Sequence, residues 1–215
     1  VLTMPVMREF PRRYRVIPLP TMPSVANTLL DAYHQFCGTH APPRVAILDW
    51  REVPTFAEFV LFEHFFHSLG LECRIVDPRE VEYREGKLYQ DDYHITLIYK
   101  RVLINELLER GGLDHPVVRA VCDGAVCMVN PFRCKPLYKK ASLAVLSDER
   151  NRRLFTAEEL QAIDAHIPWT RVVEERHTER DGRRIELIPF VLRNRERFVL
   201  KPNDDYGGKG IVLGW

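Results

Sequence analysis

The chain has 215 residues, of which 46% are hydrophobic and 28% are charged, a composition typical of folded globular proteins. Its 31 basic and 30 acidic residues leave a net charge of +1, so nucleic acid, which usually binds to a basic excess, is not expected as a partner. No apolar run approaches the roughly 18–20 residues that cross a bilayer, so no membrane partner is expected either.

The five cysteines include no pair with the CxxC spacing, and their odd number is typical of free thiols in a reducing compartment. We therefore expect a cytoplasmic location. A zinc site built from His115, Cys122, Cys127 and Cys134 is the alternative interpretation. It is disfavoured because four and six residues separate the three cysteines, which is not a usual spacing for zinc ligands, so no metal ligands are predicted in this chain.

Residues 24–130 alternate between apolar runs and amphipathic segments. The pattern predicts helices at 24–38, 55–70, 102–110 and 115–124 and buried strands at 44–50, 72–77, 94–101 and 125–130. Ser24 is the expected cap of the first helix, and Gly38 is its expected end. Residues 81–90 predict a hairpin around the Glu85-Gly86 turn. This order of elements predicts an α/β domain with a mainly parallel sheet.

Ligands of such a sheet approach the carboxyl ends of its strands. Asp49 and Arg51 directly follow the first predicted strand, Arg101 ends the third, and Asn130 follows the fourth. We therefore take Asp49, Arg51 and Asn130 as candidate substrate-binding residues. The alternative for the loop that begins at Asp49 is an ordinary solvent-facing surface.

The pattern changes after Asn130, which indicates a second domain. One amphipathic helix is expected over 135–149 and another over 156–166, where Thr156 and Glu159 match a capping box. The remaining segments predict a strand over 167–173, a charged surface loop or turn over 174–184, a helix over 185–196 and a strand over 197–202.

The last of these strands runs into a glycine-rich turn, KPNDDYGGKG. Gly207, Gly208 and Gly210 have no Cβ atoms, so the backbone can approach a phosphate and direct N–H groups at it. The turn is not a Walker loop, because Gly210 stands where Ser or Thr is required, and it is not a dinucleotide fingerprint, because a strand-like segment follows it. It predicts a hairpin flap over a triphosphate, with Lys201 beside the phosphates. A plain hairpin with a flexible tip is the alternative.

The segment VLKPNDDYGGKGIVL resembles the flap of ATP-grasp ligases such as glutathione synthetase, in which a Lys-Pro pair precedes a Gly-Gly turn. Earlier segments are similar to the same family in the same order. VNPFRCKPLYKKASLAVL resembles the start of the grasp domain, and IPWTRVV resembles one of its short strands. LIYKRV and GAVCMVNP resemble segments of the circularly permuted ATP-grasp families of bacteria. The resemblance covers roughly residues 95–215.

This resemblance implies a Rossmann-like pre-ATP-grasp α/β domain over residues 1–133, followed over 134–215 by the first, incomplete part of an α+β ATP-grasp domain. It implies an ATP-dependent carboxylate–amine ligase that acts through an acyl phosphate, similar to glutathionylspermidine or glutathione synthetase. The alternatives are a non-catalytic nucleotide-binding or regulatory module and an interaction scaffold. In this family the metal ligands and the adenine-binding segment follow the flap, so we expect the chain to be an inactive fragment of a longer enzyme.

By resemblance, Lys201 and Lys140 would contact the phosphates of ATP, with Lys139 as the competing choice for the second role. The flap would consist of Gly207, Gly208 and Gly210. Arg101, as a catalytic residue, and Asn130 would face the acceptor or acyl-phosphate site.

The expected ligands are therefore ATP, a carboxylate and an amine whose identities the sequence does not give, and Mg²⁺. The magnesium ligands are expected outside this segment, because Asp204 and Asp205 precede the flap and would lie beside the phosphates as like charges. The final apolar strand could also pair with the sheet edge of another chain, so a homo-oligomer is an alternative to a monomer.

Overall fold

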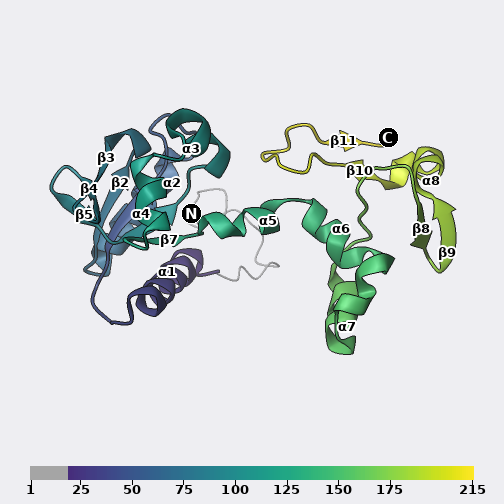
Figure 1. Cartoon of the computed structure of the whole chain (residues 1–215), viewed down its shortest axis with the longest axis horizontal. Coiled ribbons are helices and arrows are strands. Elements are labelled where there is room, and N and C mark those ends of the chain that lie inside the picture. Colours follow the sequence, from purple (N-terminus) through teal and green to yellow (C-terminus); the bar gives the residue numbers. More distant parts are fainter. Residues whose placement is uncertain (1–18) are drawn as a thin grey trace, which may run out of the picture. The chain divides into compact units, whose positions relative to one another are not determined.

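The computed structural model of the chain describes residues 19–215 (Figure 1). Residues 1–18, which the expected first domain includes, lie outside the described residues. The chain divides into two compact units between Pro131 and Phe132, close to the division after residue 133 that the sequence predicts. Within residues 19–215, no helix is both long and apolar enough to cross a membrane.

The first unit is a mixed α/β structure around a four-stranded parallel sheet. This confirms the α/β class with a mainly parallel sheet that the sequence predicts. The order of the sheet is β2-β1-β6-β7, and its strands are β1 (Arg44–Leu48), β2 (Glu72–Val76), β6 (Leu97–Lys100) and β7 (Cys127–Val129). Parallel neighbours need crossover connections. These are α2 (Phe56–Ser68) between β1 and β2, and α3 (Ile104–Gly111) and α4 (Pro116–Cys122) between β6 and β7.

Two helices pack on one face of this sheet. α1 (Thr21–Cys37) and α2 contribute Leu29, Phe59 and Phe66 to an apolar cluster that also contains Val45 and Ile47 of β1. Successive strand residues point to opposite faces. Ala46 and Leu48 therefore lie on the other face, where they are also fully buried. Burial on both faces explains why β1 is a continuous apolar run in the sequence.

Two predicted turns of this unit are confirmed. Gly38 ends α1 in the left-handed conformation, with φ of 66°. β3 (Val81–Arg84) and β4 (Lys87–Gln90) form the expected antiparallel hairpin, and the turn residues Glu85 and Gly86 have φ angles of 51° and 70°. Two consecutive positive φ angles are the geometry that suits a two-residue hairpin turn.

Two other predictions for this unit are wrong in detail. Ser24 is not the cap of α1, because the helix begins at Thr21 and the Ser24 hydroxyl donates to the Pro20 carbonyl at 2.8 Å within the first turn. The single strand expected over 94–101 is divided. β5 (Tyr93–Ile95) pairs antiparallel with β4, while β6 joins the parallel sheet. Thr96 separates the two strands, and its hydroxyl accepts a hydrogen bond from the N–H of Arg44 at 2.9 Å.

The second unit, residues 132–215, is built from short elements. Its helices are α5 (Lys135–Tyr138), α6 (Ala141–Ser147), α7 (Ala157–His166) and α8 (Leu187–Arg193). Its strands form two antiparallel hairpins, β8 (His177–Arg180) with β9 (Arg183–Glu186) and β10 (Val199–Leu200) with β11 (Val212–Leu213). Among residues 19–215 the 3-10 helices are η2 (Pro78–Glu80), η3 (Phe132–Cys134), η4 (Glu149–Leu154) and η5 (Arg195–Arg197). The capping box of Thr156 and Glu159 is confirmed at the start of α7.

Three sequence predictions for the second unit are wrong. The helix expected over 135–149 is broken at Lys139, whose extended backbone separates α5 from α6. Residues 167–173 form no strand. The charged segment 174–184, expected as a surface loop or turn, instead forms most of the β8–β9 hairpin, and only Asp181 and Gly182, at φ of 52° and 71°, make its turn. Asp-Gly is a strong hairpin signal, which the density of charge around it obscured.

The side chains of the segment 167–173 explain why it is not a strand. Arg171 Nε donates to the hydroxyl of Thr178 at 2.7 Å, and Trp169 Nε1 donates to the carbonyl of Glu179 at 2.9 Å. Both partners belong to β8. The segment is therefore held to the hairpin by side-chain hydrogen bonds rather than by a backbone ladder.

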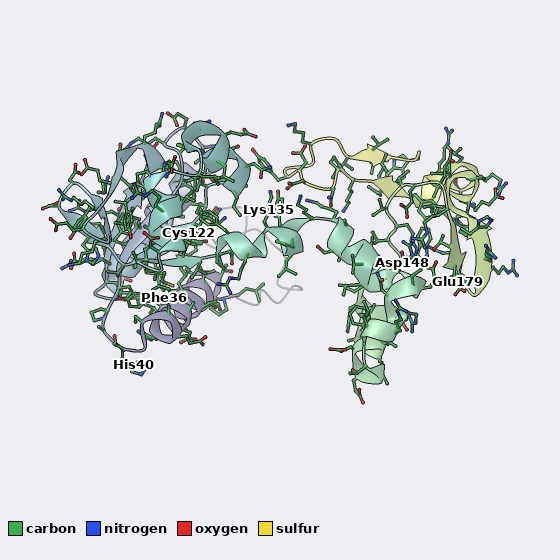
Figure 2. All side chains as sticks on the ribbon, viewed as in Figure 1. Phe36, His40, Cys122, Lys135, Asp148 and Glu179 are labelled. Carbon is green, nitrogen blue, oxygen red and sulfur yellow. The ribbon has the colours of Figure 1, made fainter. Side chains whose placement is uncertain are left out.

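A largely buried ion network links η4 to this segment. Arg176 donates to Asp148 Oδ2 at 2.6 Å and to Glu149 Oε1 at 2.8 Å. Arg171 Nη2 donates to Glu149 Oε2 at 2.7 Å, and the side chains of Arg171 and Asp148 are only 4% and 6% exposed. Figure 2 shows nitrogen-bearing side chains gathered around Asp148. Burial alone would raise the pKa of Asp148, but hydrogen bonds from Arg176 and Arg150 hold it well below its ordinary value.

We expect Arg171→Met to destabilise the second unit, because it leaves the partly buried Glu149 carboxylate without the guanidinium of Arg171, whose own side chain is only 4% exposed. Breaking a buried ion pair typically costs about 3 kcal/mol or more in the free energy of unfolding. Urea unfolding followed by circular dichroism measures the loss. Arg152→Met is the matched control, because Arg152 pairs with Asp164 at the surface, where ion pairs contribute little. Equal unfolding curves for the Arg171 variant and the wild type would contradict this role of the network.

Candidate functional site

The glycine-rich turn lies at the tip of the β10–β11 hairpin, in the second unit. The hairpin predicted from the sequence is confirmed, since Val199 pairs with Leu213 and Leu200 with Val212. Gly207, Gly208 and Gly210 have positive φ angles of 62°, 81° and 66°, which favour glycine. A Cβ atom at Gly210 would also lie 2.7 Å from Cγ of Pro202, so a larger residue there would displace the proline.

The root of this turn is bound to the break between α5 and α6. The N–H of Lys140 donates to the carbonyl of Asn203, and the N–H of Ala141 donates to the Asn203 side-chain oxygen, each at 3.0 Å. The ammonium group of Lys140 donates to the Asp205 carbonyl at 2.5 Å. Lys139 must leave the helical conformation to expose these two N–H groups, so the break in the predicted helix is what docks the glycine turn.

Three lysine ammonium groups lie beside the turn as a result. Lys135 Nζ is 2.6 Å from Asp204 Oδ1, and Lys139 Nζ is 3.5 Å from Asp204 Oδ2. The ammonium groups of Lys135 and Lys140 are both 4.7 Å from the centre of the Tyr138 ring. The hydrogen bond from Lys135 and the charges of both lysines lower the pKa of Asp204. The turn segment and residues 135–140 thus form one charged cluster, which we call the lysine–glycine site.

The structure brings together several of the second-unit residues singled out in the sequence. Lys140 lies beside the turn that contains the three glycines, as described above. Lys139 also reaches the turn, through Asp204, so the choice of Lys140 over Lys139 as the nucleotide lysine stays a prediction. Lys201 is exposed, and within residues 19–215 no hydrogen bond or ion pair joins its ammonium group.

Sequence reasoning missed two residues of this site, Lys135 and Asn203. Lys135 is 69 residues from Asp204 in sequence, so no local pattern could indicate that they meet. The available signals were weak: Lys135 stands at the start of a predicted helix, directly before Pro136, and Asn203 precedes two acidic residues in a turn.

The first-unit candidates lie at the carboxyl ends of the parallel strands, as expected. Asp49 follows β1 and is 8% exposed, and its Oδ1 accepts a hydrogen bond from the Trp50 N–H at 2.8 Å. Burial raises the pKa of Asp49, although the Trp50 N–H and the charge of Arg101 oppose it. Arg101 donates to Glu58 and to the Tyr99 hydroxyl, both at 3.1 Å.

Arg51 belongs to a different cluster. Its guanidinium donates to both carboxylate oxygens of Glu80, at distances from 2.6 to 2.9 Å, and its N–H donates to the nearly buried Asp77. Burial alone would raise the pKa of Asp77, but hydrogen bonds from Arg79 and from the Arg51 N–H lower it to about 2. These contacts hold the loop after β1 to η2, and they assign Arg51 a clear structural role. Asn130 is exposed, and no hydrogen bond of its side chain is found within the described part of the chain.

All five cysteines of the chain are free thiols, and no group of three His, Cys, Asp or Glu side chains within residues 19–215 is arranged to hold a metal ion. Comparison with known protein families and with curated proteins finds no match for this chain.

We expect Asn203→Leu to loosen the root of the glycine turn, because the N–H of Ala141 then loses its acceptor. One such hydrogen bond contributes on the order of 1 kcal/mol, so hydrogen exchange of the Ala141 amide should accelerate about fivefold. Asn203→Asp is the control, since it retains an oxygen at the same position and should keep exchange slow. Unchanged exchange in the leucine variant, read by mass spectrometry or NMR, would show that this contact does not hold the turn.

Proposed function

We propose that the lysine–glycine site binds the phosphates of ATP, in an ATP-grasp-like enzyme that joins a carboxylate to an amine through an acyl phosphate. The observation that supports this most is the meeting of the glycine turn with the ammonium groups of Lys135, Lys139 and Lys140. Lysine is a common phosphate ligand in proteins, and glycine turns supply N–H donors to the same groups.

The turn offers donors that the protein itself does not use. Within residues 19–215, no hydrogen bond engages the N–H groups of Gly207, Gly208 or Gly210. By contrast, the Tyr206 N–H is taken up by Asp205 and the Lys209 N–H by the Tyr206 carbonyl. Three free N–H donors beside three ammonium groups are the set that a chain of phosphate oxygens requires.

In the proposed reaction these groups would neutralise the charge that develops on the transferring phosphoryl group. Such catalysis consists mainly of positioning and electrostatic stabilisation, with little covalent chemistry by the protein. Lys201 and Lys140 are the proposed phosphate ligands. On the first unit, Asp49, Arg51 and Asn130 are the proposed substrate residues and Arg101 the proposed catalytic residue. For Arg51 and Arg101 this role requires that they exchange or share their present partners Glu80 and Glu58.

The same residues suit Mg²⁺ poorly. Asp204 faces Lys135 and Lys139, and the carboxylate of Asp205 lies 3.8 Å from Lys209, so each carboxylate near the turn already has a cationic neighbour. A divalent cation would be repelled by these ammonium groups. We therefore derive no catalytic step through a metal bound here.

The alternative is a nucleotide-binding or regulatory module without ligase activity. The contacts of Arg101 favour it, because the proposed catalytic guanidinium is engaged by Glu58 and Tyr99. Both functions require the same phosphate site. They differ in whether ADP is released in the presence of a carboxylate and an amine.

We expect Lys140→Met and Lys201→Met each to weaken binding of tripolyphosphate to the chain about tenfold, since a charge-assisted contact contributes roughly 1.5 kcal/mol or more. The dissociation constant can be obtained by NMR, from shifts of the Gly207, Gly208 and Gly210 amides during titration at low salt. Lys87→Met, an exposed lysine of β4, is the control and should leave binding unchanged. Tripolyphosphate that shifts no glycine amide, or that binds both variants as it binds the wild type, would refute the proposed function.

A further inference from the structure

The carboxylate of Asp204 forms ion pairs with two lysines, Lys135 and Lys139. No pattern in the sequence indicates either partner of this carboxylate. Each of its oxygens lies within ion-pair distance of a different ammonium group, 2.6 Å from Lys135 and 3.5 Å from Lys139. Two oxygens of one phosphate could make the same pair of contacts, because phosphate and carboxylate both present oxygens to ammonium groups at such distances. Asp204 therefore stands where the lysine–glycine site would accept an anion.

We propose that Lys135 is a further phosphate-binding residue, and that Asp204 is an internal anion that a phosphate group displaces from it. This inference rests on the proposed function, since it names an additional ligand and a built-in competitor at the same site.

The position of Lys135 relative to Lys140 supports its assignment. The two ammonium groups contact the ring of the same tyrosine, Tyr138, and both bond to adjacent residues of the turn, Asp204 and Asp205. Both cations therefore lie close to one ring and to neighbouring residues of the same turn. Lys135 is thus a cation beside the turn to which Lys140 also bonds.

The exposure of the pair shows that displacement is feasible. The side chains of Lys135, Lys139 and Asp204 are 22%, 40% and 25% exposed, so water and solutes reach all three. Both partners of the Lys135–Asp204 pair keep contact with solvent, and a phosphate with more than one negative charge competes well with one carboxylate. The lowered pKa of Asp204 keeps it ionised at neutral pH, where it opposes an anion nearby.

The closing experiment compares tripolyphosphate binding by the full 215-residue chain and its variants. Asp204→Asn removes the competing charge, and we expect it to tighten binding about fivefold, as the loss of one nearby like charge at partial exposure implies. Lys135→Met should weaken binding, and in the double variant the gain from Asp204→Asn should be smaller than in the single variant, because only Lys139 is then released from the carboxylate. Asp164→Asn is the control, since its carboxylate pairs with Arg152 at the surface and with none of the lysines of the site.

Further variants separate charge from damage to the fold. Asp204→Ser should tighten binding like Asp204→Asn, while Asp204→Glu, which keeps the charge, should bind like the wild type. Near-ultraviolet circular dichroism confirms that each variant is folded. If the wild type binds and Lys140→Met weakens binding, but neither neutral variant at Asp204 binds more tightly, the displacement is wrong and the proposed function stands. If the folded wild type does not bind tripolyphosphate at all, both are wrong.

Discussion

The structure of the second unit depends on pairs of oppositely charged side chains that are removed from water together. Among residues 132–215, the fully or nearly buried apolar side chains are few, namely Ala144, Ile163 and Leu187. The carboxylates of Asp148 and Glu149 and the guanidinium groups of Arg171 and Arg176 supply further interior contacts. Such groups are costly to bury unless each finds a partner, so the network specifies one arrangement of η4, the segment 167–173 and the β8–β9 hairpin.

The helix α6 connects this network to the glycine turn. Its C-terminal residue, Ser147, accepts hydrogen bonds from Arg171 and from the Thr170 N–H. At its other end, the N–H of Ala141 binds the side chain of Asn203. A single short helix thus has one end fixed in the ion network and the other at the root of the turn. The position of the lysine–glycine site therefore depends in part on the ion network at the opposite end of α6.

The elements that could be predicted from the sequence are those with local causes. The strand residues 45–48 are apolar because both faces of the sheet are covered. Gly38 is needed for a left-handed helix end. Thr156 and Glu159 form a helix cap within one turn. The β10–β11 hairpin was also evident, because its turn requires glycines. In each case the residues that determine the structure lie within a few positions of one another.

The features that could not be predicted depend on partners far apart in sequence. Arg171 meets Glu149 across 22 residues, and Lys135 meets Asp204 across 69. Read locally, the charges in 174–184 indicate a solvated loop, and the two lysines at 139–140 lie within one helical pattern. The contacts with Asn203 are what break that helix. A dense run of charges therefore indicates a solvated segment only when its counter-charges lie in the same segment. Where the partners lie elsewhere in the chain, as for Arg176 and Lys135, the local interpretation is wrong.

The most direct test of the account is a crystal structure of the chain grown with tripolyphosphate. The account predicts that the anion lies against the N–H groups of Gly207 and Gly208 and the ammonium groups of Lys135 and Lys140, with the Asp204 carboxylate moved away from Lys135. An anion bound only elsewhere on the surface, with the Lys135–Asp204 pair intact and the glycine N–H groups unoccupied, would contradict the claim that this turn is a phosphate site.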